Sequence, residues 1–101
     1  MCITKRYSSD KKMCKVTFIL PDHYAEGARK ACLVGEFNNW NTEDLRMRKV
    51  HGKFIRSLKL RTNTRYQFRY LIDEKLWKNE WDADALVPVM MGDWYNSVLI
   101  L

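Results

Sequence analysis

The stretch Tyr66-Gln67-Phe68-Arg69-Tyr70-Leu71-Ile72 decides the fold class, because large apolar residues alternate along it with other residues. Every second residue from Tyr66 to Ile72 is large and apolar, whereas Gln67 and Arg69 between them are polar. Successive side chains of a β-strand point to opposite faces of its sheet, so this spacing predicts a strand with one side toward a core.

The same alternation recurs in the segment 14–20, where Val16, Phe18 and Leu20 share one face. Polar turn residues separate such segments, and no long stretch has the spacing of an amphipathic helix. We therefore predict an all-β, antiparallel β-sandwich over residues 14–101. The other expected strands are 30–37, 54–60, 75–78 and 97–101, with a loop containing one helical turn at 22–29 and a loop at 79–95.

One expected strand breaks the alternation. Arg56 falls on the same face as Phe54 and Leu58, which are apolar. Either a β-bulge resets the register, or Arg56 lies at an edge of the sheet.

Length and composition indicate one folded domain with surplus aromatic residues. The chain has 101 residues, of which 47% are hydrophobic and 30% charged, as in ordinary globular domains. Four Trp residues are more than a small core needs. Some of these indoles are therefore candidates for a binding role.

The net charge of +6 is concentrated near the N-terminus. We expect residues 1–13 to form a flexible, basic arm. Solubility and weak attraction to anions explain this charge better than nucleic-acid recognition does.

The three cysteines have no regular spacing, so a disulfide framework is not expected. No signal peptide and no membrane-spanning segment is recognisable, which leads us to expect a cytoplasmic protein with reduced thiols and no membrane partner. Cys14 and Cys32 fall in expected strands, where buried thiols are common.

Four residues are candidates for binding a ligand: Trp40, Arg69, Trp77 and Asn96. Each of the four also has a purely structural explanation. Trp40 could cover the core, and Arg69 could be a solvated charge on a strand. Trp77 could be an indole beside a turn, and Asn96 could bond the local backbone of a turn. Trp81 is the better candidate for the core. Together, exposed indoles with an Arg and an Asn suit a sugar, whose apolar ring face stacks on aromatic rings while its hydroxyls form hydrogen bonds.

An ordered set of motifs carries a family resemblance. The runs are Leu33-Val34-Gly35-Glu36-Phe37-Asn38-Asn39-Trp40, Tyr66 to Asp73, Trp77, and Asn96-Ser97-Val98. This set resembles the isoamylase-type early-set domain, the glycogen- and starch-binding module of isoamylases, branching enzymes and the β-subunit of AMP-activated protein kinase. The chain is most similar to the stand-alone bacterial members.

The resemblance implies an immunoglobulin-like (early-set) sandwich that serves as a non-catalytic module for α-1,4-glucan. No cofactor is expected, and no metal, because His23 and His51 are not spaced with the cysteines as metal ligands. Trp40 and Trp77 would stack on glucose rings, and Asn96 would bond hydroxyls. Arg69 stands where the kinase-type module has Lys. Lys78, Trp94 and Tyr95 are secondary candidates.

Two departures from the family pattern bear on the site. The approach Glu74-Lys75-Leu76 to Trp77 differs from many members and could turn Trp77 to the other face of the sheet. Trp94 or Tyr95 could add a third stacking surface or block the site.

The sequence also raises three alternatives to sugar binding. The domain could instead dock a separate glucan-metabolising enzyme, with the aromatics as anchors and no sugar binding. An enzyme is not expected, because Glu80, Asp82 and Asp84 are the only clustered acids near an aromatic residue and turn capping accounts for them. Nucleic-acid binding rests on charge alone and ranks last.

Overall fold

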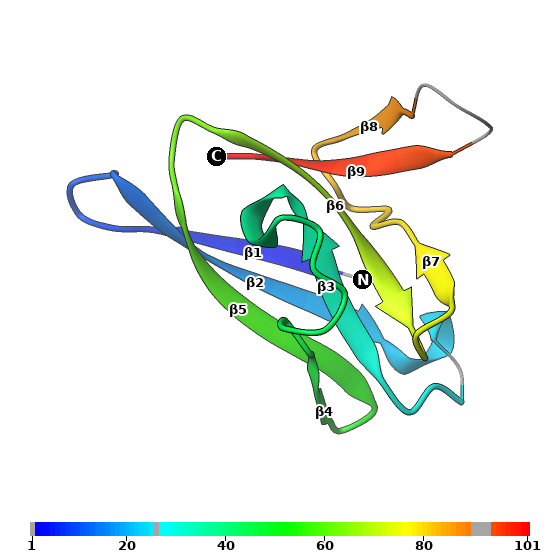
Figure 1. Ribbon diagram of the computed structural model, residues 1–101. Helices are drawn as coiled ribbons and strands as arrows, with labels where there is room; N and C mark the ends of the chain where they lie inside the picture. The colour runs from blue at the N-terminus through cyan, green and yellow to red at the C-terminus, as the bar shows by residue number, and fades with distance from the viewer. Residues whose placement is uncertain (1, 26, 90–93) are drawn as a thin grey trace.

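The computed structural model describes residues 2–25, 27–89 and 94–101, and these fold into two antiparallel β-sheets that face each other (Figure 1). Apart from two short 3-10 helices, the described elements are strands. In chain order they are β1 (Cys2–Tyr7), β2 (Met13–Pro21), η1 (Asp22–Tyr24), β3 (Ala31–Gly35), η2 (Glu36–Asn38), β4 (Arg48–Val50), β5 (Lys53–Arg61), β6 (Arg65–Ile72), β7 (Leu76–Lys78), β8 (Ala85–Pro88) and β9 (Tyr95–Ile100).

The first sheet has the strand order β1-β2-β5-β4 and the second has the order β3-β6-β9-β8, with β7 also paired to β6. Figure 1 shows strand β3 of the second sheet in front of strands β1 and β2 of the first. This architecture confirms the predicted all-β sandwich. Among the described elements, no helix is long and apolar enough to cross a membrane.

The core lies between the sheets and contains the residues that the alternation assigned to it. Phe18, Phe54, Phe68 and Tyr70 are almost fully buried. The rings of Phe18 and Phe68, from opposite sheets, meet edge to face with centroids 5.3 Å apart. Burial of one such side chain contributes about 1.5–3 kcal/mol to the free energy of folding.

The register between β2 and β5 answers the question about Arg56. It runs without interruption from Met13 paired with Arg61 to Pro21 paired with Lys53, so this strand has no bulge. Arg56 therefore stays on the inner side, and its Nη1 donates to the carbonyl of Arg46 at 3.3 Å.

The N-terminal segment differs from the flexible arm that we expected over residues 1–13. β1 pairs antiparallel with β2 over six residue pairs. Ile3 packs against the core, and Lys5 Nζ reaches Asp84 at 2.8 Å. The lysine-rich composition concealed an edge strand, a place where charged residues are often found because they oppose edge-to-edge aggregation. The sandwich therefore begins in β1, before Cys14.

Three other expectations also need correction. The predicted loop at 79–95 contains β8, and β4 follows the turns near Asn41. The expected strand 30–37 ends at Gly35, where η2 begins. Trp81, expected in the core, is 66% exposed, and the neighbouring Glu80 is fully buried instead.

Candidate functional site

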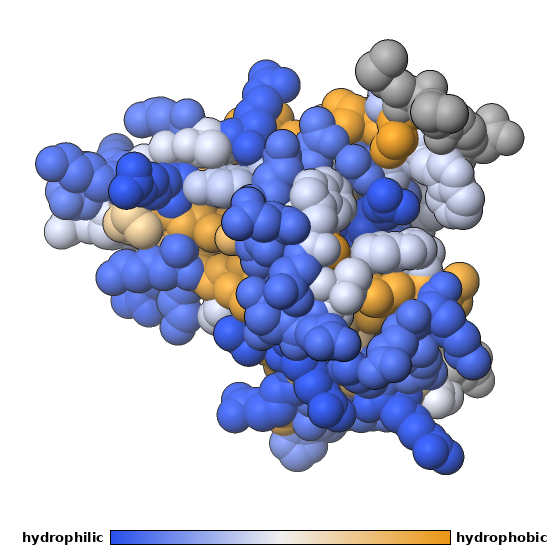
Figure 2. All heavy atoms as spheres, in the orientation of Figure 1, coloured by the Kyte–Doolittle hydropathy of each residue, from blue (hydrophilic) through white to orange (hydrophobic). Residues whose placement is uncertain are grey.

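The outer face of the second sheet carries the candidate residues. Because Phe68 and Tyr70 of β6 point into the core, Arg69 and Leu71 point outward. The register sets Val34 of β3 beside Arg69 and Trp77 of β7 beside Leu71. Figure 2 shows apolar and intermediate side chains gathered over β6 and β7 within a largely hydrophilic surface.

Trp77 is held on this face by the turn between β6 and β7. Asp73 and Glu74 both have left-handed backbone, with φ of 49° and 63°, and Lys75 N donates to the carbonyl of Ile72 at 3.1 Å. This is the turn geometry that favours a tight hairpin. The longer approach to Trp77 therefore does not turn the indole to the inner face.

A second set of bonds locks the same turn. Asp73 Oδ1 accepts the backbone N–H groups of Arg29 and Lys30 at 2.8 and 2.9 Å. These two bonds are the main reason that the pKa of Asp73 lies below its usual value of 3.8. The carboxylate thus joins the hairpin to the segment before β3.

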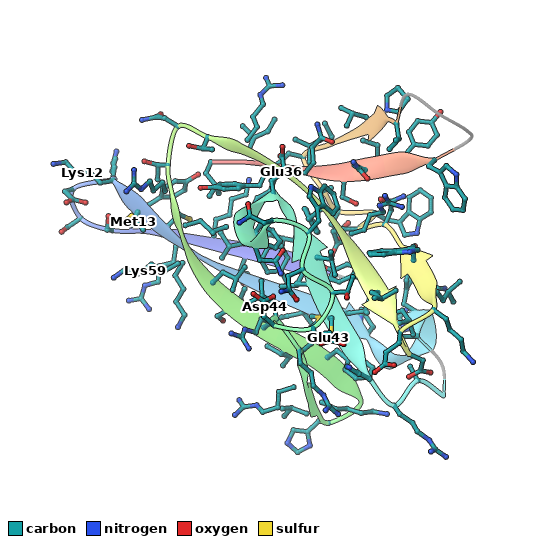
Figure 3. All side chains as sticks on the ribbon, viewed as in Figure 1. Lys12, Met13, Glu36, Glu43, Asp44 and Lys59 are labelled. Carbon is teal, nitrogen blue, oxygen red and sulfur yellow. The ribbon has the colours of Figure 1, made fainter. Side chains whose placement is uncertain are left out.

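Trp40 is positioned by the turn that follows η2. Asn38 Oδ1 accepts the N–H of Gly35 at 3.0 Å, and Asn38 Nδ2 donates to Asp44 at 2.6 Å. Trp40 N then donates to the carbonyl of Gly35 at 2.8 Å. Figure 3 shows Asp44 in the loop after η2, next to Glu43.

The backbone of this turn is unusual. Asn39 and Trp40 both have left-handed φ values, 55° and 58°. Asn tolerates this conformation, but it is strained for a bulky residue such as Trp, and such strain is concentrated at functional sites. The indole lies partly buried on the outer side of the sheet against Cys32, Val34 and Leu71, and not in the central core.

Arg69 lies between the two indoles. Its Cζ is 5.9 Å from the ring centroid of Trp40 and 5.0 Å from that of Trp77, within the range of a cation–π contact. Burial lowers the pKa of Arg69. Its Nε is buried without a hydrogen-bond partner among the described residues. The guanidinium therefore joins the two rings and retains an unused donor.

Asn96 lies beside Arg69 on the adjacent strand. The register pairs Phe68 with Ser97, so the next position sets Asn96 alongside Arg69. Asn96 Nδ2 donates to Gln67 Oε1 at 2.9 Å, while its Oδ1 is buried without a partner in the described part of the chain. Arg69 Nε and Asn96 Oδ1 thus both lack a hydrogen-bond partner among the described residues, and both atoms are buried.

Gln67 was not among the sequence candidates. Its side chain orients Asn96, and its backbone N–H donates to Glu36 Oε1 at 2.6 Å. Figure 3 labels Glu36 beside the ribbon of β6. The sequence alternation could have identified Gln67, because Gln67 lies two residues before Arg69 in the same strand and shares its outward face.

Of the three secondary candidates, Lys78 lies apart from this cluster. Lys78 pairs with Tyr70 and lies on the other side of β7, with its Nζ 5.2 Å from the ring of Tyr24. Trp94 and Tyr95 are 58% and 49% exposed at the start of β9. Gly92 and Asp93, which precede them, lie outside the described residues.

The chain matches a family of known proteins over most of its length. A family model described as the glycogen recognition site of AMP-activated protein kinase matches residues 22–100. A search of curated proteins found no significant match. Because the match spans most of the chain, the protein belongs to this family of glycogen-binding, carbohydrate-binding modules.

Proposed function

We propose that the protein binds an α-1,4-glucan, such as glycogen, starch or a maltooligosaccharide, across Trp40, Trp77, Arg69 and Asn96. The observation that carries this proposal is the guanidinium of Arg69 between the two indoles, at 5.9 and 5.0 Å from their centroids. These distances set the ring centroids no more than about 11 Å apart, so one short oligosaccharide can contact both.

The chemistry of a glucan fits this arrangement. Each glucose ring has an apolar face that stacks on an indole and an edge of hydroxyl groups that donate and accept hydrogen bonds. Arg69 carries guanidinium N–H donors and Asn96 a side-chain amide beside the indoles, and both kinds of group form hydrogen bonds with hydroxyls. These polar groups make a polyhydroxylated chain a better ligand here than a purely apolar one.

We propose that the module has no catalytic activity. Modules of this family are non-catalytic. The clustered acids have structural bonds: Glu80 accepts the Tyr70 hydroxyl at 2.8 Å, and Asp84 accepts the N–H of Ile100 at 2.7 Å. Incubation with amylopectin should therefore release no reducing ends, and a rise in reducing ends above the buffer blank would contradict this.

Isothermal titration with maltoheptaose and β-cyclodextrin tests the binding proposal. Trp40→Ala should weaken binding by about 5- to 150-fold, equivalent to the ~1–3 kcal/mol of one stacking aromatic residue. Tyr7→Ala, at an exposed ring on the first sheet, is the control that should bind normally. Equal affinity of Trp40→Ala and the native protein would refute the proposed site.

A second candidate function is the docking of a separate glucan-metabolising enzyme, and the outer face of the first sheet favours it. Arg6, Lys15 and Lys59 lie side by side across β1, β2 and β5. Figure 3 shows Lys59 at this end of the sheet, near Lys12. Like charges on neighbouring strands repel, and an acidic partner surface would relieve this repulsion.

Charge reversal tests this candidate. Lys15→Glu combined with Lys59→Glu should abolish co-purification with a glucan-active enzyme and leave titration with maltoheptaose unchanged. Retention on DNA that falls steeply with salt would point to nucleic acid instead.

We place the protein in the cytoplasm, a location that agrees with the free, buried thiols of Cys14 and Cys32.

A further inference from the structure

Trp81 is an exposed indole on a turn that is firmly held. Its side chain is 66% exposed, the largest exposure of any large hydrophobic residue described. A side chain this exposed is open to contact with a ligand, and its surroundings decide whether it has such a role.

The residues on either side of Trp81 anchor the turn to the second sheet. Glu80 N donates to Ser97 Oγ at 2.8 Å, and the Glu80 carboxylate accepts the Tyr70 hydroxyl and the Asp82 N–H, both at 2.8 Å. Glu80 is fully buried. Burying a carboxyl group is unfavourable unless it is well bonded, so these bonds hold Trp81 at a fixed place at the sheet edge.

Trp81 lines a pocket of about 310 Å³ together with four residues of η1, β7 and the following turn. Its volume lies at the lower end of the range for small-molecule sites. The lining combines three aromatic side chains with an amine and an amide, the groups that stack on a sugar ring and bond its hydroxyls. The lining residues are Tyr24, Trp77, Lys78, Asn79 and Trp81.

The pocket is continuous with the proposed glucan site because Trp77 belongs to both. The indole of Trp77 contacts Arg69, with Cζ 5.0 Å from its centroid. The same residue lines the pocket with Trp81. A chain that stacks on Trp77 and continues past the edge of β7 therefore enters the pocket.

We propose that Trp81 and the adjoining pocket form an additional subsite for one more glucosyl residue of the same α-glucan chain. The inference rests on the proposed function, since the chain reaches the pocket from Trp77. The main site accepts a short oligosaccharide, whereas the Trp81 subsite is filled only by a longer chain. Affinity therefore rises with chain length, and Trp81 is responsible for the increase.

The test compares maltotriose with maltoheptaose by titration. Trp81→Ala should weaken maltoheptaose binding on the order of 10-fold, the effect of losing one stacking aromatic residue, and leave maltotriose binding unchanged. Tyr7→Ala is the control for loss of an exposed aromatic residue elsewhere. The urea midpoint of Trp81→Ala should equal that of the native protein, because the lost side chain is exposed.

Indole N–H signals in a ¹⁵N-labelled sample separate this subsite from the proposed function. With maltoheptaose, shifts at Trp40, Trp77 and Trp81 support both. Shifts at Trp40 and Trp77 alone, with native affinity in Trp81→Ala, overturn the subsite and leave the proposed function intact. A shift at Trp81 alone supports a sugar site there and overturns the main site. The absence of any shift overturns both.

Discussion

Gly35 is the position where the structure makes the sharpest prediction about the turn that carries Trp40. A Cβ atom at Gly35 would lie 2.6 Å from Phe68 Cβ and 2.6 Å from the carbonyl oxygen of Gln67. Its φ of −172° is extended backbone that any residue adopts, so the restriction is steric and not conformational. The atoms that would be met belong to or adjoin the backbone of β6, and they cannot move without separating β3 from β6.

Overpacking of a core costs about 1–3 kcal/mol, and we expect Gly35→Ala to lie at the upper end, about 3 kcal/mol of unfolding free energy. For a domain of this size such a loss lowers Tm on the order of 15 °C. Since Gly35 accepts the bond from Trp40 N, glucan affinity should fall as well. Urea unfolding monitored by Trp fluorescence, combined with a maltoheptaose titration, measures both effects.

Gly27→Ala is the matched control. Gly27 has φ of +71°, but a Cβ there would meet nothing within 4 Å. Left-handed strain alone should cost on the order of 1 kcal/mol, with no change in glucan affinity. If Gly35→Ala unfolds at the native urea midpoint and binds glucan normally, the close approach of β3 to β6 and its link to Trp40 are refuted.

Two further predictions concern pH and buried charge. The pKa of Asp73 is lowered by its bonds to two backbone N–H groups, so its contribution to stability is present above the ordinary value of 3.8 and is lost as pH falls through the lower folded-state value. Urea midpoints of Asp73→Asn should therefore change less on acidification than those of the native protein, and parallel acid profiles would contradict this. Burial raises the pKa of Glu80 above its ordinary value of 4.5, so the folded protein binds the Glu80 proton more tightly than the unfolded chain does. The free energy of unfolding therefore falls as pH rises from 4.5 through the folded-state pKa. Glu80→Gln keeps a polar partner for the Tyr70 hydroxyl and for the Asp82 N–H without the charge. The urea midpoint of Glu80→Gln relative to that of the native protein should therefore increase over this pH range. A difference in midpoint that stays constant with pH would count against a buried, titrating carboxyl group.

The sequence predicted the site best where strand alternation governs the geometry. Phe68 and Arg69 are neighbours in one strand, and their opposite orientations followed from the period of the β-strand alone. The meeting of Trp40 with Arg69 could not be derived in this way. It depends on two consecutive left-handed residues and on the bonds of the Asn38 side chain, and only the family resemblance pointed to it.

The sequence was misleading where composition conceals a pairing partner. The basic residues of the N-terminal segment suggested a solvated arm, because the ladder of β1 to β2 is a non-local contact that charge does not reveal. Trp81 was expected in the core because it lies four residues beyond Trp77, farther from the hairpin turn, yet Glu80 occupies the buried position. The Tyr70 hydroxyl and the Ser97 Oγ that stabilise Glu80 there come from distant strands.

The central claim is that one glucan chain lies on the indoles of Trp40 and Trp77 at the same time, with Arg69 between them. Intermolecular nuclear Overhauser effects between maltoheptaose and the protein measure this most directly. We expect contacts from the ring C–H protons of glucose to the indole protons of both Trp40 and Trp77. Contacts to neither indole, or a bound sugar that contacts only the outer face of the first sheet, would contradict it.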